Sequence, residues 1–278
     1  MTDEPLEVEP DEYYTPEIKS HSLEKIRLHN RYAGLFATAM HRKWPQRAYV
    51  GLYSGAGHAR IARSDRIIET SALGVLRIPH RFTHYIYVDQ DERCIEALEA
   101  RSRPLSSDVD LRIIQTDVNE CARRVRESLP SFSRHNGLLS FCFVDPFDLR
   151  LRFDTLRELG ELKMDFLVLL MLGVDGRRNF KQYLENTSST RIGDLIDCPD
   201  WRSEYQPHVR PIRFLLRKFD RAMQGIGYLS AIDDLHSIHI SGKGVLQYIL
   251  AFYSKSELGL RFWRQSRSTL AIQRSLFE

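Results

Sequence analysis

Three aspartates whose carboxylates could recognise a ligand each stand at the end of a predicted strand. Asp89 closes the segment HYIYVD, Asp117 closes LRIIQTD and Asp145 closes LLSFCFVD. Because parallel strands present their carboxyl ends along one edge of a sheet, we expect the three carboxylates to gather at that edge. A carboxylate there can accept hydrogen bonds from ribose hydroxyls, from an adenine amine or from the amino group of a substrate.

A loop of small residues follows the first predicted strand and belongs to the same edge. The residues expected to bind a cofactor here are Tyr53, Ser54, Gly55, Ala56 and Gly57. Glycines let the backbone turn sharply and approach a ligand closely. Arg60 occupies the position of the third glycine in the dinucleotide fingerprint, which argues against a pyrophosphate site. A plain tight turn is the alternative interpretation.

The first two acids are expected to hold the nucleoside part of a cofactor. Asp89, with its neighbour Gln90, would hold the ribose, and Asp117, with Val118, would hold the adenine. Asp89 lies 34 positions (89 minus 55) after the first glycine of the loop, more than the usual spacing of about 20 residues. An insertion over His58–Glu69 accounts for the excess. Each acid could instead cap the helix that follows it.

The segment Asp145-Pro146-Phe147 is the clearest candidate for catalysis. Pro146 fixes the backbone of the turn. Asp145 and the next carbonyl could accept hydrogen bonds from an amino group and so orient its lone pair toward a methyl donor. Phe147 could stack on a planar substrate such as a flipped base. The structural alternative is a strand-terminating turn followed by a core phenylalanine.

The charge of the chain is unevenly distributed. Residues 1–17 hold seven acidic residues and no lysine or arginine, so the other 261 residues carry a net charge of +10. A basic body suits a polyanionic partner such as nucleic acid. A basic helix face is the predicted contact, formed by Arg210, Arg213, Arg217, Lys218 and Arg221. A solvated helix face is the alternative.

Other classes of protein are disfavoured by the composition. The four cysteines lie far apart without a metal-ligand spacing, so no metal site is predicted. The longest apolar run, Phe166–Val174, is too short to cross a bilayer, and the acidic N-terminus has no apolar signal segment. We therefore expect a cytoplasmic protein with no membrane partner.

The order of predicted elements indicates an α/β fold. Residues 1–16 are expected to form an acidic leader, disordered or loosely docked, and residues 17–278 a single α/β domain. Within that domain we distinguish a helical extension (17–45), a cofactor-binding core (48–175) and a C-terminal part with the basic helix and a hairpin (176–278). The predicted strands of the core are Ala48–Tyr53, His84–Asp89, Leu111–Asp117, Leu138–Asp145 and Asp165–Leu172.

These strands alternate with helices, which predicts a doubly wound, mostly parallel, Rossmann-like sheet. A C-terminal antiparallel hairpin is predicted from Leu235–Ser241 and Val245–Ser254, turning at Gly242-Lys243-Gly244. Five parallel strands followed by such a hairpin are typical of methyltransferases, by analogy of fold.

The sequence also resembles the three-Cys-motif partner protein family. The resemblance is carried by short segments in order: Lys19-Ser20-His21, the segment Tyr49–Gly57, Thr70–Leu73, Tyr87–Asp89, Thr116–Asn119, Phe143–Phe147, Tyr248–Leu250 and Phe262-Trp263. It implies a methyltransferase-type fold, a bacterial or phage-related setting, and a partner protein with a three-cysteine, radical-type motif. The loop Tyr-Ser-Gly-Ala-Gly departs from the aromatic-Ala-Gly-Pro-Gly that is usual in the family.

The function expected from these features is methyl transfer from S-adenosylmethionine to an amino group, with nucleic acid as the substrate class. Lys19 is expected to close over the cofactor. Two alternatives stay open. One is a non-catalytic module that binds a nucleotide or cofactor and serves a three-cysteine partner. The other is a metal-dependent nucleotide-processing enzyme that uses the three strand-end aspartates.

Overall fold

Seven strands form the central sheet, in the order β10-β11-β9-β8-β3-β6-β7. The structure is a computed structural model that describes residues 4–131, 137–177, 179–239 and 245–277. Five neighbouring strands are parallel: β3 (Gln46–Leu52), β6 (His84–Asp89), β7 (Asp110–Gln115), β8 (Leu138–Val144) and β9 (Asp165–Leu170). β11 (Leu246–Tyr253) pairs antiparallel with β9, and β10 (His236–His239) pairs antiparallel with β11. This plan confirms the predicted Rossmann-like, methyltransferase-type fold class.

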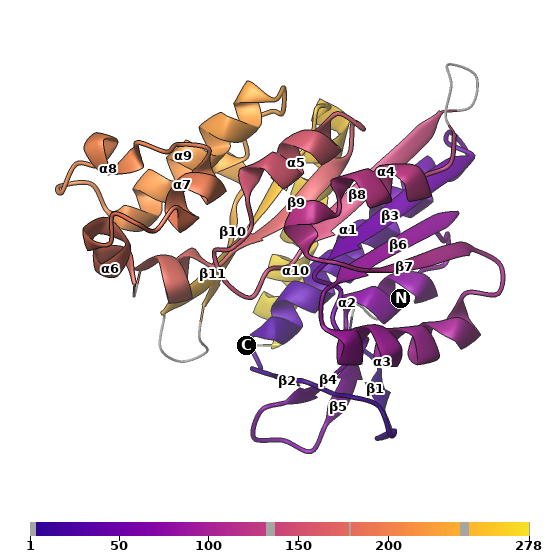
Figure 1. Ribbon diagram of the computed structural model, residues 1–278. Helices are drawn as coiled ribbons and strands as arrows, with labels where there is room; N and C mark the ends of the chain where they lie inside the picture. The colour runs from indigo at the N-terminus through magenta and orange to yellow at the C-terminus, as the bar shows by residue number, and fades with distance from the viewer. Residues whose placement is uncertain (1–3, 132–136, 178, 240–244, 278) are drawn as a thin grey trace.

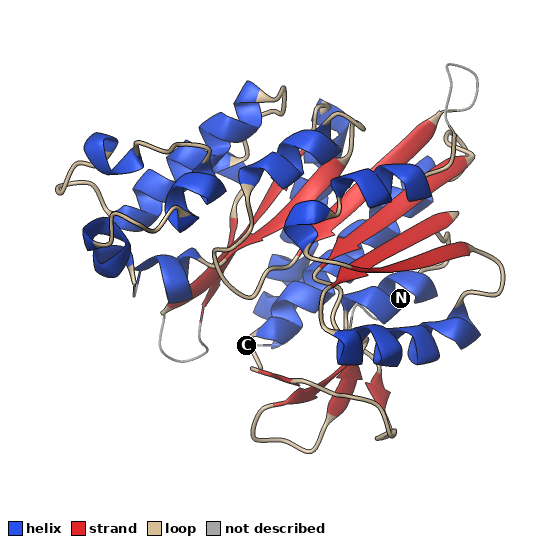
Figure 2. Cartoon of the chain, in the orientation of Figure 1, coloured by secondary structure: helices blue, strands red, loops and turns tan. Residues whose placement is uncertain are grey.

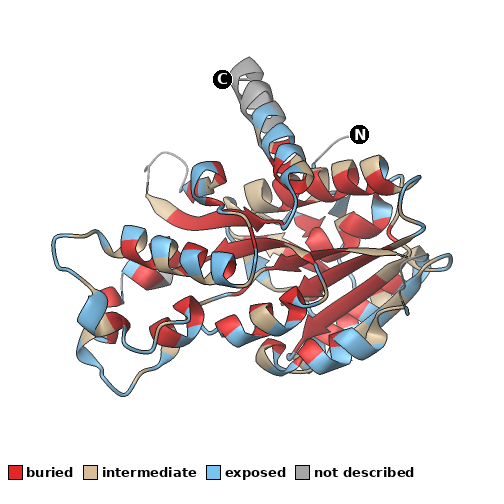
Figure 3. Cartoon of the chain, turned by 90° about the horizontal axis from the view of Figure 1, so that it is seen from above, coloured by how far each residue is buried: buried red, intermediate tan, exposed pale blue. Residues whose placement is uncertain are grey.

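Helices cover both faces of the sheet, as Figures 1 and 2 show. One face packs against α4 (Ala122–Ser128), α5 (Phe153–Gly160), α7 (Arg191–Ile196) and α9 (Pro211–Gly225). The other packs against α1 (Ser22–Met40), α2 (Ser71–Gly74), α3 (Glu92–Ser102) and α10 (Glu257–Phe277). The inner strands β3, β6, β8, β9 and β11 are covered on both sides and are buried along almost their whole length, whereas the edge strands β7 and β10 are partly exposed (Figure 3).

Short elements connect this framework. They are the single-turn helices η1 (Val75–Arg77), η2 (Arg103–Leu105), η3 (Val118–Glu120), η4 (Leu172–Gly176) and η5 (Ile232–Asp234), with α6 (Phe180–Glu185) and α8 (Trp201–Glu204). α6 to α9 gather at one end of the molecule in Figure 1. The predicted turn Gly242-Lys243-Gly244 lies outside the described residues.

A second, small sheet lies beside the main one, in the order β1-β5-β4-β2. Its strands are β1 (Glu7–Val8), β2 (Glu17–Ile18), β4 (His58–Ile61) and β5 (Ile67–Glu69). The predicted insertion after the glycine loop is therefore the hairpin β4–β5, and residues from the chain's start complete its sheet on both sides.

The N-terminal segment, residues 4–18, differs from the expected disordered or loosely docked leader. It contributes two strands and is anchored by Arg101 of α3, whose guanidinium bonds Asp11 in two places, at 2.5 and 2.8 Å. Composition alone missed this, because the counter-charge comes from a distant part of the sequence. The predicted helix from Glu17 likewise begins later, at Ser22, since Glu17 and Ile18 pair with β4.

Within the described residues, no helix is both long and apolar enough to span a membrane.

Candidate functional site

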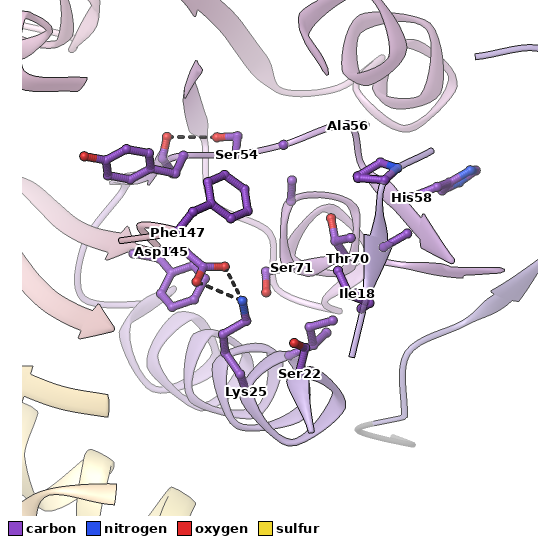
Figure 4. A pocket seen from close by; sticks show the side chains of 18 of the residues that line it. Ile18, Ser22, Lys25, Ser54, Ala56, His58, Thr70, Ser71, Asp145 and Phe147 are labelled. Atoms are coloured by element: carbon purple, nitrogen blue, oxygen red, sulfur yellow. Dashed lines mark hydrogen bonds and ion pairs between the residues drawn. The ribbon is translucent and has the colours of Figure 1, made fainter. Parts of the chain in front are cut away.

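A pocket opens at the carboxyl ends of β3 and β8, the two neighbouring strands at which the order of the parallel sheet reverses. This is the position where open α/β sheets bind their ligands. The cavity volume of the pocket is about 100 Å³, and the empty space is about 700 Å³ when the open mouth is included. Figure 4 shows side chains converging on it from α1, α2, the loop after β3 and the turn after β8.

The loop after β3 forms one wall of the pocket through Tyr53, Ser54, Gly55 and Ala56. Its backbone turns through left-handed conformations at Tyr53 (φ 61°), Gly55 (φ 65°) and Gly57 (φ 82°). A β-carbon added to Gly55 would meet no heavy atom within 4 Å, whereas one on Gly57 would approach Leu73 at 3.1 Å. Gly55 therefore leaves open space for a ligand, and Gly57 serves close packing of the loop.

Asp89 lies behind this loop and is buried. Its Oδ2 accepts a hydrogen bond from the backbone N–H of Gly55 at 2.8 Å, and its Oδ1 accepts one from Asp91 N–H at 3.1 Å. The helix cap itself is Asp91, which accepts from Arg93 N–H. The carboxylate of Asp89 thus fixes the turned backbone of Gly55, and it keeps unused acceptor capacity because a carboxylate has about four lone-pair sites.

Asp145 and Lys25 form an ion pair inside the pocket. Nζ of Lys25 lies 2.8 Å from Oδ1 and 2.6 Å from Oδ2 of Asp145, and the two side chains are only 15% and 19% exposed. The backbone N–H of Asp145 bonds the carbonyl of Leu52 at 3.2 Å, which ties the end of β8 to the end of β3. A nitrogen donor therefore already occupies the place where an amino group was expected to bind.

A buried histidine, His29, contacts Tyr49 in the wall of the pocket. Tyr49 lines the pocket, and its hydroxyl lies 2.9 Å from Nε2 of His29. Burial lowers the pKa of His29 to about 4, so its ring is neutral near pH 7. The amide oxygen of Asn30 lies 2.9 Å from Nδ1, which assigns the single ring proton to Nδ1. Nε2 then accepts the hydrogen bond of the Tyr49 hydroxyl.

Phe147 lies at the mouth of the pocket and is 75% exposed, so it is not the core residue that the structural alternative required. Pro146 is buried beside it. An exposed aromatic ring next to a carboxylate provides a flat apolar surface on which a planar group can stack.

The N-terminal segment closes the opposite wall through Pro16, Glu17 and Ile18. Arg101, 4% exposed, holds this wall in place because one guanidinium bonds both the segment and the loop after β3. It donates to the carbonyls of Tyr14 (3.0 Å) and Ala56 (2.6 Å), besides Asp11. The two walls are therefore coupled through one buried side chain.

Asp117 belongs to a different groove. It is exposed, and its carboxylate accepts from Asn119 N–H at 2.8 Å as the cap of η3. The groove it lines runs along η3, the loop before α5 and the start of α7. The charge of Asp117 still affects Tyr53. Burial raises the pKa of the Tyr53 phenol, and the nearby carboxylates of Asp117 and Asp148 raise it further.

The structure thus gathers part of the predicted site and separates the rest. The pocket contains Tyr53, Ser54, Gly55, Ala56, Asp145 and Phe147. Outside its lining lie Lys19, Gly57, Asp89, Gln90, Asp117, Val118 and Pro146. Sequence reasoning chose the exposed Lys19 and missed Lys25. The signal was that Lys25 lies on the same helical stripe as Leu28, His29 and Tyr32, all buried.

The basic helix face is also divided. Arg210, Arg213 and Arg217 line a separate hollow, whereas Lys218 pairs with Glu204. The free cysteines Cys94, Cys121 and Cys142 are buried and Cys198 is partly buried. Among the described residues no group of three or more potential ligands is arranged to hold a metal ion.

No family model and no curated protein matches the chain. Similar solved structures include an O-methyltransferase from Bacillus cereus in complex with SAH (7% identity, 84% of this chain and 87% of that chain, TM-score 0.46). A geranyl diphosphate methyltransferase in complex with SAM has 13% identity, covers 84% and 87%, and gives a TM-score of 0.41. The N-methyltransferase NodS from Bradyrhizobium japonicum has 7% identity, covers 81% and 95%, and gives a TM-score of 0.39. The assignment of the fold itself rests on the order and direction of the strands.

Proposed function

We propose that this protein is an S-adenosylmethionine-dependent methyltransferase that acts on an amino group, with nucleic acid as the substrate class. The observation that carries the proposal is the pocket at the reversal of strand order, with a left-handed glycine loop on one wall and Asp145 and Phe147 on another. The net charge of the whole chain is +3, and the exposed arginines Arg210, Arg213 and Arg217 around one hollow favour a polyanionic substrate.

The residues present fit a nucleoside-bearing cofactor. The open space at Gly55 admits a ligand against the loop, and Asp89, behind the loop, holds the turned backbone of Gly55 in place. When bound, S-adenosylmethionine supplies a methyl group activated by a sulfonium centre. Asp117, which lines another groove, has no part in this proposal.

Asp145 has the role of holding the amino group. Its carboxylate accepts hydrogen bonds from the Lys25 ammonium, which supports the proposal that a nitrogen donor can be held at this place. An incoming amine would take over one or both oxygens, with Lys25 moving aside. Asp145 would then fix the direction of the amine lone pair while Phe147 stacks on the attached ring. The main catalytic contribution would be orientation of the two reactants.

The test is transfer of a labelled methyl group from S-adenosylmethionine to total cellular nucleic acid. Asp145→Ala should abolish transfer while changing the affinity for S-adenosylhomocysteine less than about threefold. Asp148→Ala is the matched control, because Asp148 is three residues away but does not line the pocket. Unchanged turnover in Asp145→Ala would remove this residue from the mechanism.

The two alternatives give different results in the same assay. A non-catalytic module serving a three-cysteine partner would bind S-adenosylhomocysteine and co-purify with that partner, but would transfer no methyl group. A metal-dependent enzyme needs the three strand-end aspartates together. They are instead engaged separately, with Gly55, with the cap of η3 and with Lys25.

A further inference from the structure

A second and larger hollow lies along α9. It spans about 1630 Å³ with its open side included. Arg177, His208, Arg210, Arg213 and Arg217 line it over an apolar floor, and none of its lining residues is acidic. The structure therefore brings together three residues of the predicted basic face with two basic residues from elsewhere in the chain.

This basic groove lies at the same edge of the sheet as the pocket. Leu246, one of its lining residues, begins β11, and Arg177 follows η4, the turn that leaves the carboxyl end of β9. β11 is two strands from β8 in the sheet. At about 4.8 Å between neighbouring strands, the groove begins roughly 10 Å from the end of β8.

The cations of the groove are available for a ligand. Arg177, Arg210, Arg213 and Arg217 are exposed, and none of them forms an ion pair within the part of the chain that the structure describes. Lys218 on the same helix differs, because it is committed to Glu204. Unpaired arginines around one concave surface create a field that attracts anions.

We propose that this groove binds the phosphodiester backbone of a single-stranded nucleic acid whose target base enters the pocket at Asp145 and Phe147. The inference rests on the proposed function and names the surface that would hold its substrate. Arginine binds phosphate in a bidentate manner. The cavity volume of the hollow, about 940 Å³, lies at the upper end of the roughly 300–1,000 Å³ range of small-molecule sites, so the row of cations rather than the volume favours an extended ligand.

The spacing of the arginines also suits a polymer. Arg210, which caps the start of α9, and Arg217 on the helix are seven residues apart, which is about 10 Å at 1.5 Å per residue. That length can span more than one phosphate of an extended single strand. No Phe, Tyr or Trp among the described residues lines the groove, and the large exposed ring beside the pocket belongs to Phe147. A single strand is the favoured ligand because its bases reach the pocket without the unstacking and unpairing energy that flipping a base out of a duplex costs.

The experiment measures binding of fluorescein-labelled single-stranded RNA and DNA by anisotropy over a series of salt concentrations. Four phosphate contacts predict a slope of log K against log salt of about −2.8. The triple substitution Arg210→Gln, Arg213→Gln and Arg217→Gln should bring the slope to about −0.7 and weaken binding about 100-fold near 0.1 M salt. The matched control removes the same charge from α4, as Arg123→Gln, Arg124→Gln and Arg126→Gln, and should retain most of the slope.

The inference is overturned if the α9 triple variant binds like the wild type, if both triple variants weaken binding equally, or if poly-glutamate binds as tightly as RNA. A preference for RNA or for DNA shows which of the two nucleic acids supplies the bound phosphodiester backbone. Tighter binding of a duplex than of a single strand would contradict the single-strand assignment. Calorimetry with S-adenosylhomocysteine on the wild type separates the two proposals. If S-adenosylhomocysteine does not bind while nucleic acid still binds, the methyltransferase proposal is contradicted and the proposed nucleic-acid groove stands.

Discussion

Arg101 provides a direct perturbation of the packing that closes the pocket. Arg101→Met keeps most of the side-chain volume but removes the guanidinium, which is 4% exposed and bonded to Asp11, to Thr15 Oγ1 and to the carbonyls of Tyr13, Tyr14 and Ala56. Breaking a buried ion pair by removing one partner typically costs about 3–5 kcal/mol. Because Asp11 is partly exposed, we expect the lower end, about 3 kcal/mol of the free energy of unfolding.

The matched control is Arg93→Met on the same helix. Arg93 pairs with Asp91 and lies over the ring of Tyr14 at 4.3 Å, but its side chain is 63% exposed. Exposed pairs contribute little, so we expect the free energy of unfolding to change far less in this variant than in Arg101→Met. Urea unfolding followed by tryptophan fluorescence measures both values.

The same substitution should release the N-terminal segment. Tyr13 and Tyr14 are partly exposed, and chymotrypsin, which cleaves after aromatic residues, should cut there faster in Arg101→Met than in Arg93→Met. The hydrogen bond from Arg101 is the main cause that lowers the pKa of Asp11 below 3.8. Its stabilisation is therefore complete above pH 3.8 and lost as the pH falls through the lower folded pKa. Equal losses of stability in the two variants, or unchanged cleavage, would refute this account of the segment.

Two further predictions concern the walls of the pocket. Gly57→Ala should lower the free energy of unfolding by about 3 kcal/mol, because its backbone is left-handed and the added β-carbon would lie 3.1–3.2 Å from Leu73 and Leu98. Gly55→Ala should lower it by only about 1 kcal/mol, because the added β-carbon meets open space. Similar losses for the two variants in urea unfolding would be inconsistent with the open space at Gly55. The pKa of His29 is about 6.5 in the unfolded chain and about 4 in the folded protein, so the unfolded chain takes up a proton in this pH range before the folded protein does. Stability should therefore fall by up to about 3 kcal/mol as the pH drops through that window. His29→Gln should lose this part of the pH dependence, and the same acid slope in both proteins would contradict a buried neutral histidine.

The elements of the main sheet could be predicted because their pattern is local. The segment His84–Asp89 was predicted with the bounds that the structure gives β6, and the other four core strands were placed within two residues of their ends. Continuous apolar runs bounded by acids and turns define such strands without reference to the rest of the chain.

The partners within the site could not be predicted, because they depend on contacts across the sequence. Asp89 was placed correctly at the end of its strand, but its bond to Gly55 N–H requires the left-handed turn of a loop 34 positions earlier. Lys25 reaches Asp145 only because α1 crosses the ends of β3 and β8. A lysine on an otherwise buried stripe was the available signal, since a buried charge requires a partner.

The central claim is that the pocket between β3 and β8 binds S-adenosylmethionine against the loop after β3. Isothermal titration of S-adenosylhomocysteine into the wild type and into Gly55→Phe tests it most directly, because a side chain at Gly55 would enter space that is now free of protein atoms. We predict one saturable site in the wild type and its loss in Gly55→Phe, with cooperative unfolding preserved. No heat of binding to the wild type at about 1 mM ligand, or equal binding by both proteins, would contradict the claim.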